Sequence, residues 1–516
     1  MDDTESAGER TNHGSSERMR DTILVYDIGT TSVKTALYDF TGELLSSVQV
    51  PYKTRYFNNG WAQQDPEDYW KAAVEGTSQL LNSVGSTACQ IHVISLCGHM
   101  NGALCIDENG KATYPQIIHC DTRAKSESAM IKEQFGQDML YRRSGNRIDE
   151  YLSLPKILWI ARNESESYRK TRHIINAKDY LRGKLTGIFG STDFSDASLT
   201  GALDIHEKRW NIPLLQELGL EESHFGPILT STEIEGTLSS ESARILNLPS
   251  GIPVAAGGGD ASCSTRGAMI TDDHSGYACI GSSAWISLLQ GAPVDDPHMR
   301  MQHFFDLDGE HVNVCGTVQS AGSALDWAKE RFISDRSFEQ IEEELQRREP
   351  RRPLIALPYF MGERTPHWNA DARSALIGMS LTTDSLDLMG AYYESVAFAL
   401  EEVMEIYEDL NLPVDTFTLL GGGAKSRYWS QMISDVLNRT ITIHPFYQHA
   451  TSYGASLAGA VAVGQYKSLD EAIMADRSNP SVITADAQRH ERYQKNITLY
   501  KKAYRALEPL FSQLET

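Results

Sequence analysis

Two stretches of this chain, one in each half, follow the same order of an apolar strand, a glycine with two hydroxyl residues, and a second strand. The first reads YDIGTTSVKTALY over residues 26–38, and the second reads ACIGSSAWISLL over residues 278–289. A chain of 516 residues is too long for one ordinary hydrophobic core. The repeat therefore predicts two domains that share one architecture.

The first hundred residues predict a sheet covered by a helix. We expect strands over 22–28, 33–38, 44–50 and 89–98, and a hairpin over 102–115. The apolar run of the first strand suits a strand that is buried on both faces. Asp65 is a favourable N-cap for a helix that has Pro66 in its first turn. Strands that alternate with helices are typical of an α/β fold.

The second half repeats this alternation. We expect a strand, a glycine turn and a small-residue helix over 251–269, a long helix over 385–410, and a strand, a glycine loop and a helix over 419–438. A boundary near 265–275 divides the chain almost evenly. The predicted organisation is a disordered tail at 1–20, an N-terminal domain at 21–268 and a C-terminal domain at 269–516.

Charge and cysteine content argue against several functional classes. The formal net charge of −22 disfavours nucleic acids and anionic membranes as partners. No segment has the roughly 18 consecutive apolar residues of a membrane span, and the polar N-terminus lacks the apolar core of a secretory signal. The 7 cysteines form no CxxC pair, which indicates reduced thiols and a cytoplasmic protein. Four of them lack zinc-finger spacing, namely Cys89, Cys97, Cys105 and Cys120.

Asp27 and the turn after it combine groups that bind phosphate. The backbone N–H groups of a glycine turn and nearby hydroxyls form a concave anion site, here at Gly29, Thr30 and Thr31. Lys34 adds a positive charge, and Asp27 at a strand end suits a hydrated Mg²⁺. A plain hairpin, whose threonines simply favour strands and turns, is the alternative that these residues leave open.

Asp260 follows three consecutive glycines, Gly257 to Gly259. Glycines let the backbone approach a ligand closely. A carboxylate at this place can take the proton of a substrate hydroxyl, as the base does in phosphoryl transfer to alcohols. The alternative is that Asp260 is the N-cap of the helix that follows.

Two further glycine turns are candidates for nucleotide contacts. One is Gly281, Ser282 and Ser283, which repeats the earlier turn at 29–31, and the other is Gly421, Gly422 and Gly423 before a helix. Bare backbone at a helix start can admit a phosphate or an adenine ring. A plain loop and a plain strand-to-helix turn are the respective alternatives.

Polar groups stand at other expected strand ends, which usually face a crevice in α/β proteins. They are His99, Asn101, Asp121 and Arg123, and each is open to a purely structural interpretation. Glu363 and Arg364 in GERTPHW are interpreted as a pair that braces its loop. Two glycine–hydroxyl turns, the acids near them and a third glycine loop together indicate a nucleotide-dependent phosphotransferase.

Nine segments between residue 22 and about 465 carry a family resemblance. They are DIGTTSVKTALYD, GWAQQDPEDYW, YLSLPKILWIARN, KDYLRGKLTG, TDFSDASLTGALD, GGGDASCS, GERTPHWNADARSALIGMSL, LLGGGAKSRYWSQMISDVLN and GASLAGAVAVGQY. In these segments and their order, the chain resembles the FGGY family of carbohydrate kinases. YLSLPKILWIARN matches the first family signature at each position, whereas 374–394 follows the second loosely, with Tyr392 where a small residue is usual.

The resemblance implies two actin-like, ribonuclease-H-like domains with a cleft between them, the sugar mainly on the first and ATP mainly on the second. Asp260 becomes the general base, and Asp27 a ligand of Mg²⁺. The implied phosphate and nucleotide contacts are Gly29, Thr30, Thr31, Lys34, Gly281, Ser282, Ser283, Gly421, Gly422 and Gly423. The implied sugar contacts are His99, Met100, Asn101, Asp121, Arg123 and Asp260.

The implied activity is ATP-dependent phosphorylation of a terminal hydroxyl of a small sugar. Within the family, the pattern is most similar to xylulokinases and next to gluconokinases. It departs from xylulokinases at three presumed sugar contacts, namely Asn101 for a usual histidine, Ala261 for a usual asparagine, and His119–Asp121 for a usual Trp-Asn-Asp. A ketopentose is therefore expected, with gluconate or another polyol or sugar acid as the alternative.

Two other functional classes stay open at this point. One is a regulator that binds nucleotide and sugar without catalysis, and the other is a hydrolase in which Asp260 activates water. The retention of both Asp27 and Asp260 favours an enzyme over a regulator. A small-molecule sugar is the expected partner, and a homodimer is allowed for.

Overall fold

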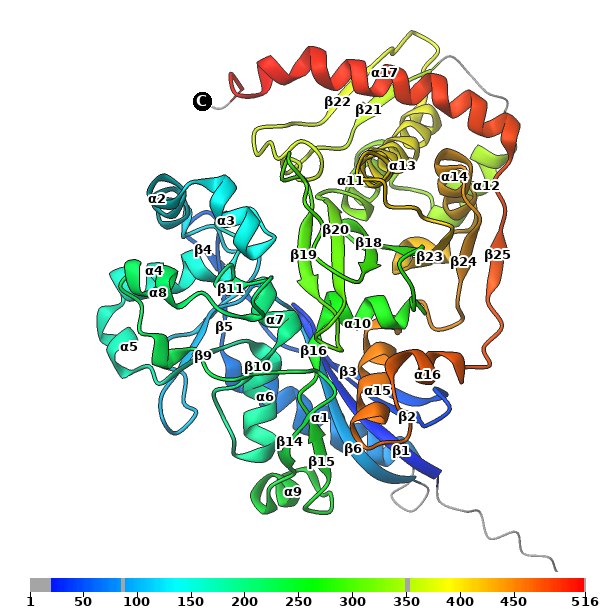
Figure 1. Ribbon diagram of the computed structural model, residues 1–516. Coiled ribbons are helices and arrows are strands. Elements are labelled where there is room, and N and C mark those ends of the chain that lie inside the picture. Colours follow the sequence, from blue (N-terminus) through cyan, green and yellow to red (C-terminus); the bar gives the residue numbers. More distant parts are fainter. Residues whose placement is uncertain (1–19, 85–88, 349–352, 515–516) are drawn as a thin grey trace, which may run out of the picture.

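Two seven-stranded sheets organise the computed structural model, which describes residues 20–84, 89–348 and 353–514 (Figure 1). The first sheet has the strand order β14-β15-β6-β1-β2-β3, and β16 pairs with β6. Its strands are β1 (Arg20–Ile28), β2 (Ser32–Asp39), β3 (Leu44–Pro51), β6 (Cys89–Gly98), β14 (Ile234–Thr237), β15 (Pro253–Ala255) and β16 (Gly258–Gly259). The four strands expected in the first hundred residues are confirmed.

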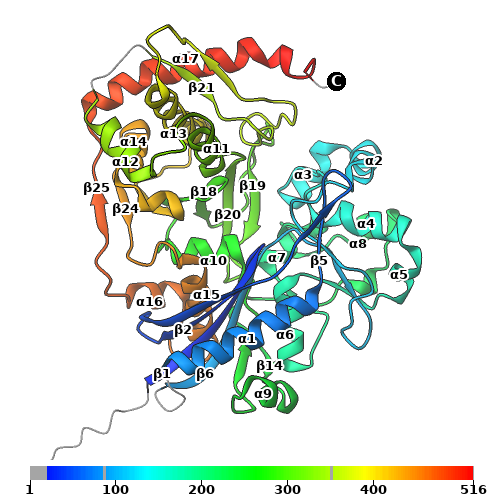
Figure 2. The ribbon, with the colours of Figure 1, turned by 180° about the vertical axis from the view of Figure 1, so that it is seen from behind.

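β1 is buried on both faces, and its side chains alternate between two cores. Leu24 and Tyr26 pack on one face, whereas Ile23 and Val25 pack on the other. The first face is covered by α1 (Pro66–Val84), α6 (Ala177–Thr186) and α9 (Ser240–Leu246). The second face is covered by α15 (Ala450–Ala462) and α16 (Leu469–Met474), which come from the other end of the chain (Figure 2).

The second sheet has the order β19-β20-β18-β17-β23-β24-β25. Its strands are β17 (Ser275–Ile280), β18 (Ala284–Gln290), β19 (Gln302–Phe305), β20 (Val312–Val318), β23 (Thr416–Leu420), β24 (Ile441–Ile443) and β25 (Ser481–Ile483). The largest core lies between this sheet and α11 (Gly322–Phe332), α12 (Phe338–Gln346), α13 (Ser385–Asp409), α14 (Arg427–Leu437) and α17 (Ala487–Phe511).

The repeat seen in the sequence is also present in the two sheets. β1 pairs antiparallel with β2 and parallel with β6, and β17 pairs antiparallel with β18 and parallel with β23. In each sheet, the glycine–hydroxyl turn therefore joins the first two strands beside a parallel neighbour. The prediction of an α/β protein with two related sheets is confirmed.

Two helices pack tightly against each other between the sheets, α10 (Asp260–Gly267) and α15. A Cβ atom built on Gly267 would lie 1.9 Å from the carbonyl oxygen of Ala450, and one on Gly454 would lie 1.9 Å from that of Cys263. Only glycine permits such a close approach of two helix backbones. The helix that starts at Asp260 is thereby fixed in the middle of the molecule.

The remaining elements flank the two sheets. The helices beside the first sheet are α2 (Lys125–Phe135), α3 (Gln137–Ser144), α4 (Ser153–Asn163), α5 (Ser165–Lys170), α7 (Phe194–Ser198) and α8 (Ile212–Glu217). One small sheet there has three strands, β4 (Arg55–Phe57), β5 (Trp61–Gln64) and β8 (Gln116–Ile117). Three others have two strands each: β7 (Leu104–Ile106) with β9 (His173–Ile175), β10 (Thr192–Asp193) with β13 (Ile228–Leu229), and β11 (Leu203–Asp204) with β12 (Arg209–Trp210). β21 (Ile355–Leu357) and β22 (Ala375–Ile377) pair antiparallel and lie beneath α17 (Figure 1).

Some expectations are refined and others fall outside the described residues. The hairpin expected over 102–115 closes between Asp107 N–H and the Lys111 carbonyl, but β7 pairs mainly with β9. The expected tail, apart from Arg20, lies outside the described residues. The boundary between 268 and 269 stays a prediction, and α15 of the second half packs on the first sheet.

Three properties of the described residues bear on the functional class. The six cysteines whose side chains are described are all free thiols. None of the described helices combines the length and the hydropathy that a bilayer-spanning helix requires. Within 20–84, 89–348 and 353–514, no three His, Cys, Asp or Glu side chains gather in a way that could hold a metal ion.

Candidate active site

Asp27 and Asp260 stand at the carboxyl ends of β1 and β16, two strands that pair in parallel with β6 from opposite sides. In the strand register Asp27 pairs with Cys97 of β6, and Cys97 pairs with Gly258 of β16. β16 ends at Gly259, and Asp260 is the next residue. The carboxyl edge of parallel strands is where α/β proteins bind ligands.

Asp260 is the first residue of α10, and the N-cap position belongs to Gly259. Its Oδ1 accepts a hydrogen bond from the N–H of Ala261 at 2.8 Å. Burial, and then the negative charge of Asp27, raise the pKa of Asp260 to about 7. A carboxylate with a pKa near neutrality is suited to general base catalysis. The N-cap alternative does not describe the position that Asp260 occupies.

In the turn after Asp27, the backbone carbonyls accept hydrogen bonds from neighbouring residues, which leaves the hydrogen-bond donors of the turn available. The hydroxyl of Tyr52 donates to the Gly29 carbonyl, and the N–H of Tyr52 donates to the Thr31 carbonyl at 3.0 Å. The Thr30 carbonyl accepts from the side chains of Thr54 at 3.0 Å and Gln64 at 2.7 Å. With the carbonyls engaged, the hydroxyls and N–H groups of Thr30 and Thr31 are the groups left to meet an anion.

Lys34 lies opposite Asp27 across the β1–β2 pairing. Its Nζ is 3.6 Å from Asp27 Oδ2, and both side chains are partly exposed, at 21% and 13% respectively. The turn therefore carries a cation and a carboxylate beside its outward donors. A cation of this kind can form a charge-assisted hydrogen bond to a phosphate, and the carboxylate can accompany a metal ion bound to that phosphate.

The second glycine–hydroxyl turn is held in the same manner. The Gly281 carbonyl accepts from Gly322 N–H at 2.9 Å. The Ser282 carbonyl accepts from Ala321 N–H at 2.9 Å and from the Ser323 hydroxyl at 2.9 Å. As in the first turn, the exposed groups that remain are donors.

A pocket of about 360 Å³ joins this turn to the third glycine loop. Gly281, Ser282, Gly422 and Gly423 line it together, whereas Ser283 and Gly421 are not among its lining residues, and the nucleotide role of all six stays a prediction. Apolar side chains form much of its wall, namely Leu325, Phe338, Tyr393 and Trp429. The sequence did not single out these four, because in helices they read as core positions. A mostly apolar pocket with glycine backbone at one end suits a nucleoside with phosphates.

His99 and Asn101 carry buried polar atoms without partners, and the ring of His119 lies near that of His99. Both ring nitrogens of His99 and the Oδ1 of Asn101 are buried without a hydrogen-bond partner among the described residues. The rings of His99 and His119 lie 6.0 Å apart, and burial lowers the pKa of His99 to about 4. Lys156 supports this group from behind, since its Nζ binds the Asn101 carbonyl at 2.7 Å. A buried polar atom without a partner calls for a specific explanation, and hydroxyls of a bound ligand would satisfy these three atoms.

Met100 lies against the glycine loop that precedes Asp260, where a Cβ atom on Gly259 would be 2.5 Å from its sulfur. Asp121 and Arg123 are engaged with each other, at 2.7 Å between Asp121 Oδ2 and an Arg123 nitrogen, and both side chains are fully buried. The Arg123 guanidinium also lies 4.1 Å from the ring centre of Trp61. These contacts give the pair a bracing role, and its direct contact with sugar stays a prediction.

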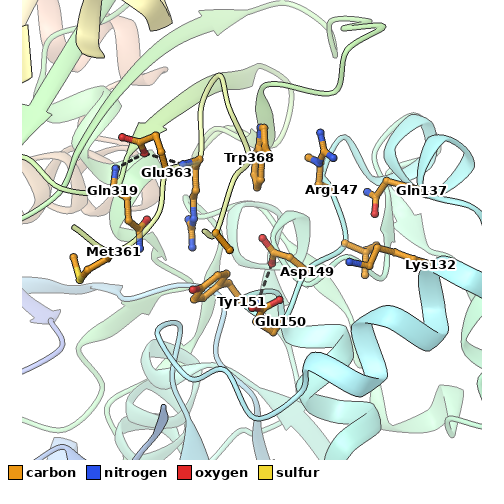
Figure 3. Close-up of a pocket in the computed structure, with 13 residues that line it drawn as sticks. Lys132, Gln137, Arg147, Asp149, Glu150, Tyr151, Gln319, Met361, Glu363 and Trp368 are labelled. Carbon is orange, nitrogen blue, oxygen red and sulfur yellow. Dashed lines mark hydrogen bonds between the residues drawn. The ribbon is translucent and has the colours of Figure 1, made fainter. Parts of the chain in front are cut away.

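A second cleft of about 390 Å³ opens between the two halves of the chain (Figure 3). Arg147 and Tyr151 line it from the first half, and Glu363, Arg364 and Trp368 line it from the second. The expected Glu363–Arg364 pair is replaced by other contacts. Glu363 accepts from the N–H groups of Gln319 and Arg364, both at 2.7 Å, while the Arg364 guanidinium lies over the ring of Tyr151.

Comparison with models of known protein families identifies the family of this chain. The models for the N-terminal and C-terminal domains of the FGGY family of carbohydrate kinases match residues 22–267 and 276–463. The chain belongs to the FGGY family. The predictions of this family, of its two actin-like domains and of an ATP-dependent sugar kinase are confirmed.

Relatives of this FGGY kinase include two named for different sugars. A xylulose kinase of Bacillus subtilis (strain 168) is 30% identical over 498 residues, which cover 96% of this chain and 99% of the relative. A gluconokinase of the same organism is 27% identical over 504 residues, 95% of each chain. The solved structure of a xylulose kinase from Brucella ovis has a TM-score of 0.88 at 27% identity, covering 95% of this chain and 100% of its own.

Proposed function

We propose that this FGGY kinase transfers the γ-phosphoryl group of ATP to the terminal hydroxyl of a ketopentose such as D-xylulose. The position of Asp260 carries the proposal, because a partly buried carboxylate with a pKa of about 7 stands one strand away from β1, which leads to the first phosphate turn. The full-length similarity to a xylulose kinase supports the ketopentose.

In the proposed mechanism, Asp260 accepts the proton of the sugar hydroxyl as that oxygen attacks the γ-phosphorus in line. Phosphoryl transfer requires positioning and charge neutralisation more than covalent chemistry. Thr30 and Thr31 would donate to the transferring phosphoryl group, and Ser282 and Ser283 to the other phosphates. Gly422 and Gly423 would contact the nucleoside in the pocket beside Trp429.

Asp27 fits a role in holding Mg²⁺. The described residues offer no cluster of three or more metal ligands, and Asp27 is a partly exposed carboxylate next to the phosphate turn. Mg²⁺ is commonly held by one or two carboxylates together with water and substrate phosphates. When bound, it would neutralise charge on the phosphate oxygens, while Asp27 and Lys34 would orient the group around it.

The sugar would lie between Asp260 and the group formed by His99, Asn101 and His119. The uncommitted nitrogens of His99 and the Oδ1 of Asn101 offer hydrogen bonds to hydroxyls of the acceptor. A site built on such buried polar atoms discriminates strongly against acceptors that leave them unpaired. The identity of the sugar is therefore expected to depend on these three residues.

A panel of acceptors tests the proposal. ADP release would be measured with D-xylulose, L-xylulose, D-ribulose, gluconate, glycerol and erythritol, and without acceptor. We expect kcat/KM for D-xylulose to exceed that for gluconate by at least about tenfold. A preference for gluconate would overturn the ketopentose assignment. ADP release that no acceptor stimulates would overturn the kinase mechanism in favour of a regulator or a hydrolase.

A further inference from the structure

The backbone of the loop that precedes Asp260 is tied down at almost every step. The Ala256 carbonyl accepts from Arg182 at 2.8 Å, and the N–H of Ala256 donates to the Glu233 carbonyl at 2.8 Å. The N–H of Gly257 donates to the Ser231 carbonyl at 3.0 Å. The last anchor before Asp260 is the hydroxyl of Ser195, which holds the N–H of Gly259.

Ser195 accepts the N–H of Gly259 at 2.7 Å, directly before Asp260. A hydroxyl can accept in a fixed direction when its own proton is committed elsewhere. Here the Ser195 hydroxyl donates to Asp193 Oδ2, which also accepts from the Ser231 hydroxyl at 2.8 Å. Asp193 therefore sets the orientation in which Ser195 meets Gly259.

Lys178 holds Asp193 in turn. Its Nζ lies 2.8 Å from Asp193 Oδ1, 2.6 Å from Asp179 Oδ1 and 2.9 Å from Asp196 Oδ2, and all four side chains are almost fully buried. Removing one partner from such a buried charge group leaves the others uncompensated. The group lies against β6, since a Cβ atom on Gly98 would be 3.2 Å from Lys178 Cβ. It is thus close to the place where β16 pairs with β6.

Gly259 needs such an anchor. A Cβ atom at this position would lie 2.5 Å from the sulfur of Met100, so glycine is the residue that fits without displacing the Met100 side chain. Glycine places little restraint on its own backbone, and the direction of the next side chain then depends on hydrogen bonds. The Ser195 hydroxyl supplies that restraint one residue before Asp260.

We propose that Ser195, oriented by Asp193 and Lys178, is a positioning residue that fixes the Gly259 amide and through it the direction of the Asp260 carboxylate. The inference rests on the proposed role of Asp260 as the base. None of the three residues lies in the nucleotide pocket or in the cleft between the halves, so their effect on turnover reaches the reacting atoms through Gly259.

Ser195→Ala and Ser198→Ala form a matched pair for the test. Ser198 is on the same helix and equally buried, but its hydroxyl accepts from Phe305 N–H at 3.0 Å and donates to the Phe194 carbonyl at 2.6 Å. Both variants lose one buried hydroxyl and should lose similar thermal stability. We expect only Ser195→Ala to lower kcat, by about 10- to 100-fold, with the KM for sugar and ATP within about twofold of wild type.

Two further measurements complete the design. Ser195→Thr keeps the hydroxyl and should restore kcat to within about threefold of wild type. Hydrogen–deuterium exchange of the peptide spanning 256–261 should accelerate in Ser195→Ala and not in Ser198→Ala, a readout that needs no substrate. Should Ser195→Ala fail to fold, Ser231→Ala removes only the second donor to Asp193 and is expected to lower kcat by about three- to tenfold.

Equal kcat losses in Ser195→Ala and Ser198→Ala, or wild-type kcat in Ser195→Ala or Ser231→Ala, would overturn the positioning role. Asp260→Asn separates this failure from failure of the proposed function. If Asp260→Asn abolishes turnover while the two serine variants behave alike, only the positioning inference is wrong. If Asp260→Asn turns over normally, the assignment of the base is wrong, and the positioning inference falls with it.

Discussion

Arg364 lies over the ring of Tyr151, with its guanidinium carbon 4.6 Å from the ring centre. The contact crosses the cleft between the two halves, and Arg147 makes the reciprocal contact with Trp368 at 5.2 Å. Each half thus supplies one arginine and one aromatic ring to the other. Such cation–π contacts contribute about 0.5–2 kcal/mol each, depending on how far they are desolvated.

The first prediction concerns this contact. Closure of FGGY kinase halves around the sugar should include the Arg364–Tyr151 contact, so Arg364→Ala should raise the KM for sugar by about 2- to 30-fold. The KM for ATP should stay within about twofold, because the nucleotide pocket is built from the second half alone. Initial rates at saturating ATP measure the first quantity.

A double-mutant cycle supplies the control. Arg364→Ala and Tyr151→Ala should each raise the KM for sugar, and the double variant should raise it by less than the product of the two effects, since both changes remove one interaction. Strict additivity of the two free-energy changes would show that the two side chains act independently of each other.

The second prediction concerns pH. Because the base must be unprotonated and the pKa of Asp260 is raised to about 7, kcat should increase from pH 6 to 8 and level off above that range. Asp260→Asn should lower kcat by at least about 100-fold while ATP binding persists. Steady-state rates from pH 5.5 to 9 and calorimetric ATP titrations test both statements. A flat profile for the wild type would contradict the assignment.

The same pKa shift predicts a change in stability. A carboxyl whose pKa is higher in the folded than in the unfolded chain binds its proton more tightly when folded, so its contribution to stability is lost as pH rises from about 4 through 7. Asp260→Asn removes the charge. Its Tm at pH 8 should therefore exceed that of the wild type by about 1–3 °C, and the difference should vanish near pH 4. Thermal scans at the two pH values measure it.

The third prediction concerns Mg²⁺. Asp27→Asn should raise the Mg²⁺ concentration required for half-maximal activity by about tenfold or more, because it removes the carboxylate next to the phosphate turn. It should also shift the acidic limb of kcat to lower pH, because Asp27 contributes to the raised pKa of Asp260. Asp21→Asn is the control, since Asp21 is an exposed carboxylate at the other end of the same strand. An unchanged Mg²⁺ requirement in Asp27→Asn would exclude the metal role.

Local patterns sufficed to predict much of the fold. The apolar run of β1, the N-cap at Asp65 and the two glycine–hydroxyl turns each depend on neighbours in sequence, and each is found where expected. The grouping of Gly281 with Gly422 in one pocket was also predictable, because both follow the carboxyl ends of strands that could pair in parallel.

Contacts between distant segments could not be predicted in this way. Arg364 was interpreted as a partner of Glu363 because the two are adjacent, whereas burial commits Glu363 to backbone amides and leaves Arg364 to reach Tyr151. Asp121 and Arg123 were interpreted as ligand contacts because polar residues at strand ends often face a crevice. Their burial as an ion pair beside Trp61 depends on how β5 packs, which the sequence does not show. The link from Ser195 to Gly259 likewise joins residues that no local pattern connects.

The last prediction separates two adjacent glycines in the nucleotide pocket. A Cβ atom on Gly422 would have its nearest contact at 4.0 Å and point into open space, whereas one on Gly423 would lie 2.8 Å from Ile280 Cβ. Gly422→Ala should therefore keep the Tm within about 1 °C and raise the KM for ATP by about three- to tenfold, since its methyl group occupies space that the nucleotide needs. Gly423→Ala should lower the Tm by about 2–6 °C because it overpacks the end of β17. Thermal scans and ATP titrations of both variants at saturating sugar measure the four quantities. Wild-type ATP affinity in Gly422→Ala would remove this loop from the nucleotide site, and an unchanged Tm in Gly423→Ala would contradict the packing that places it there.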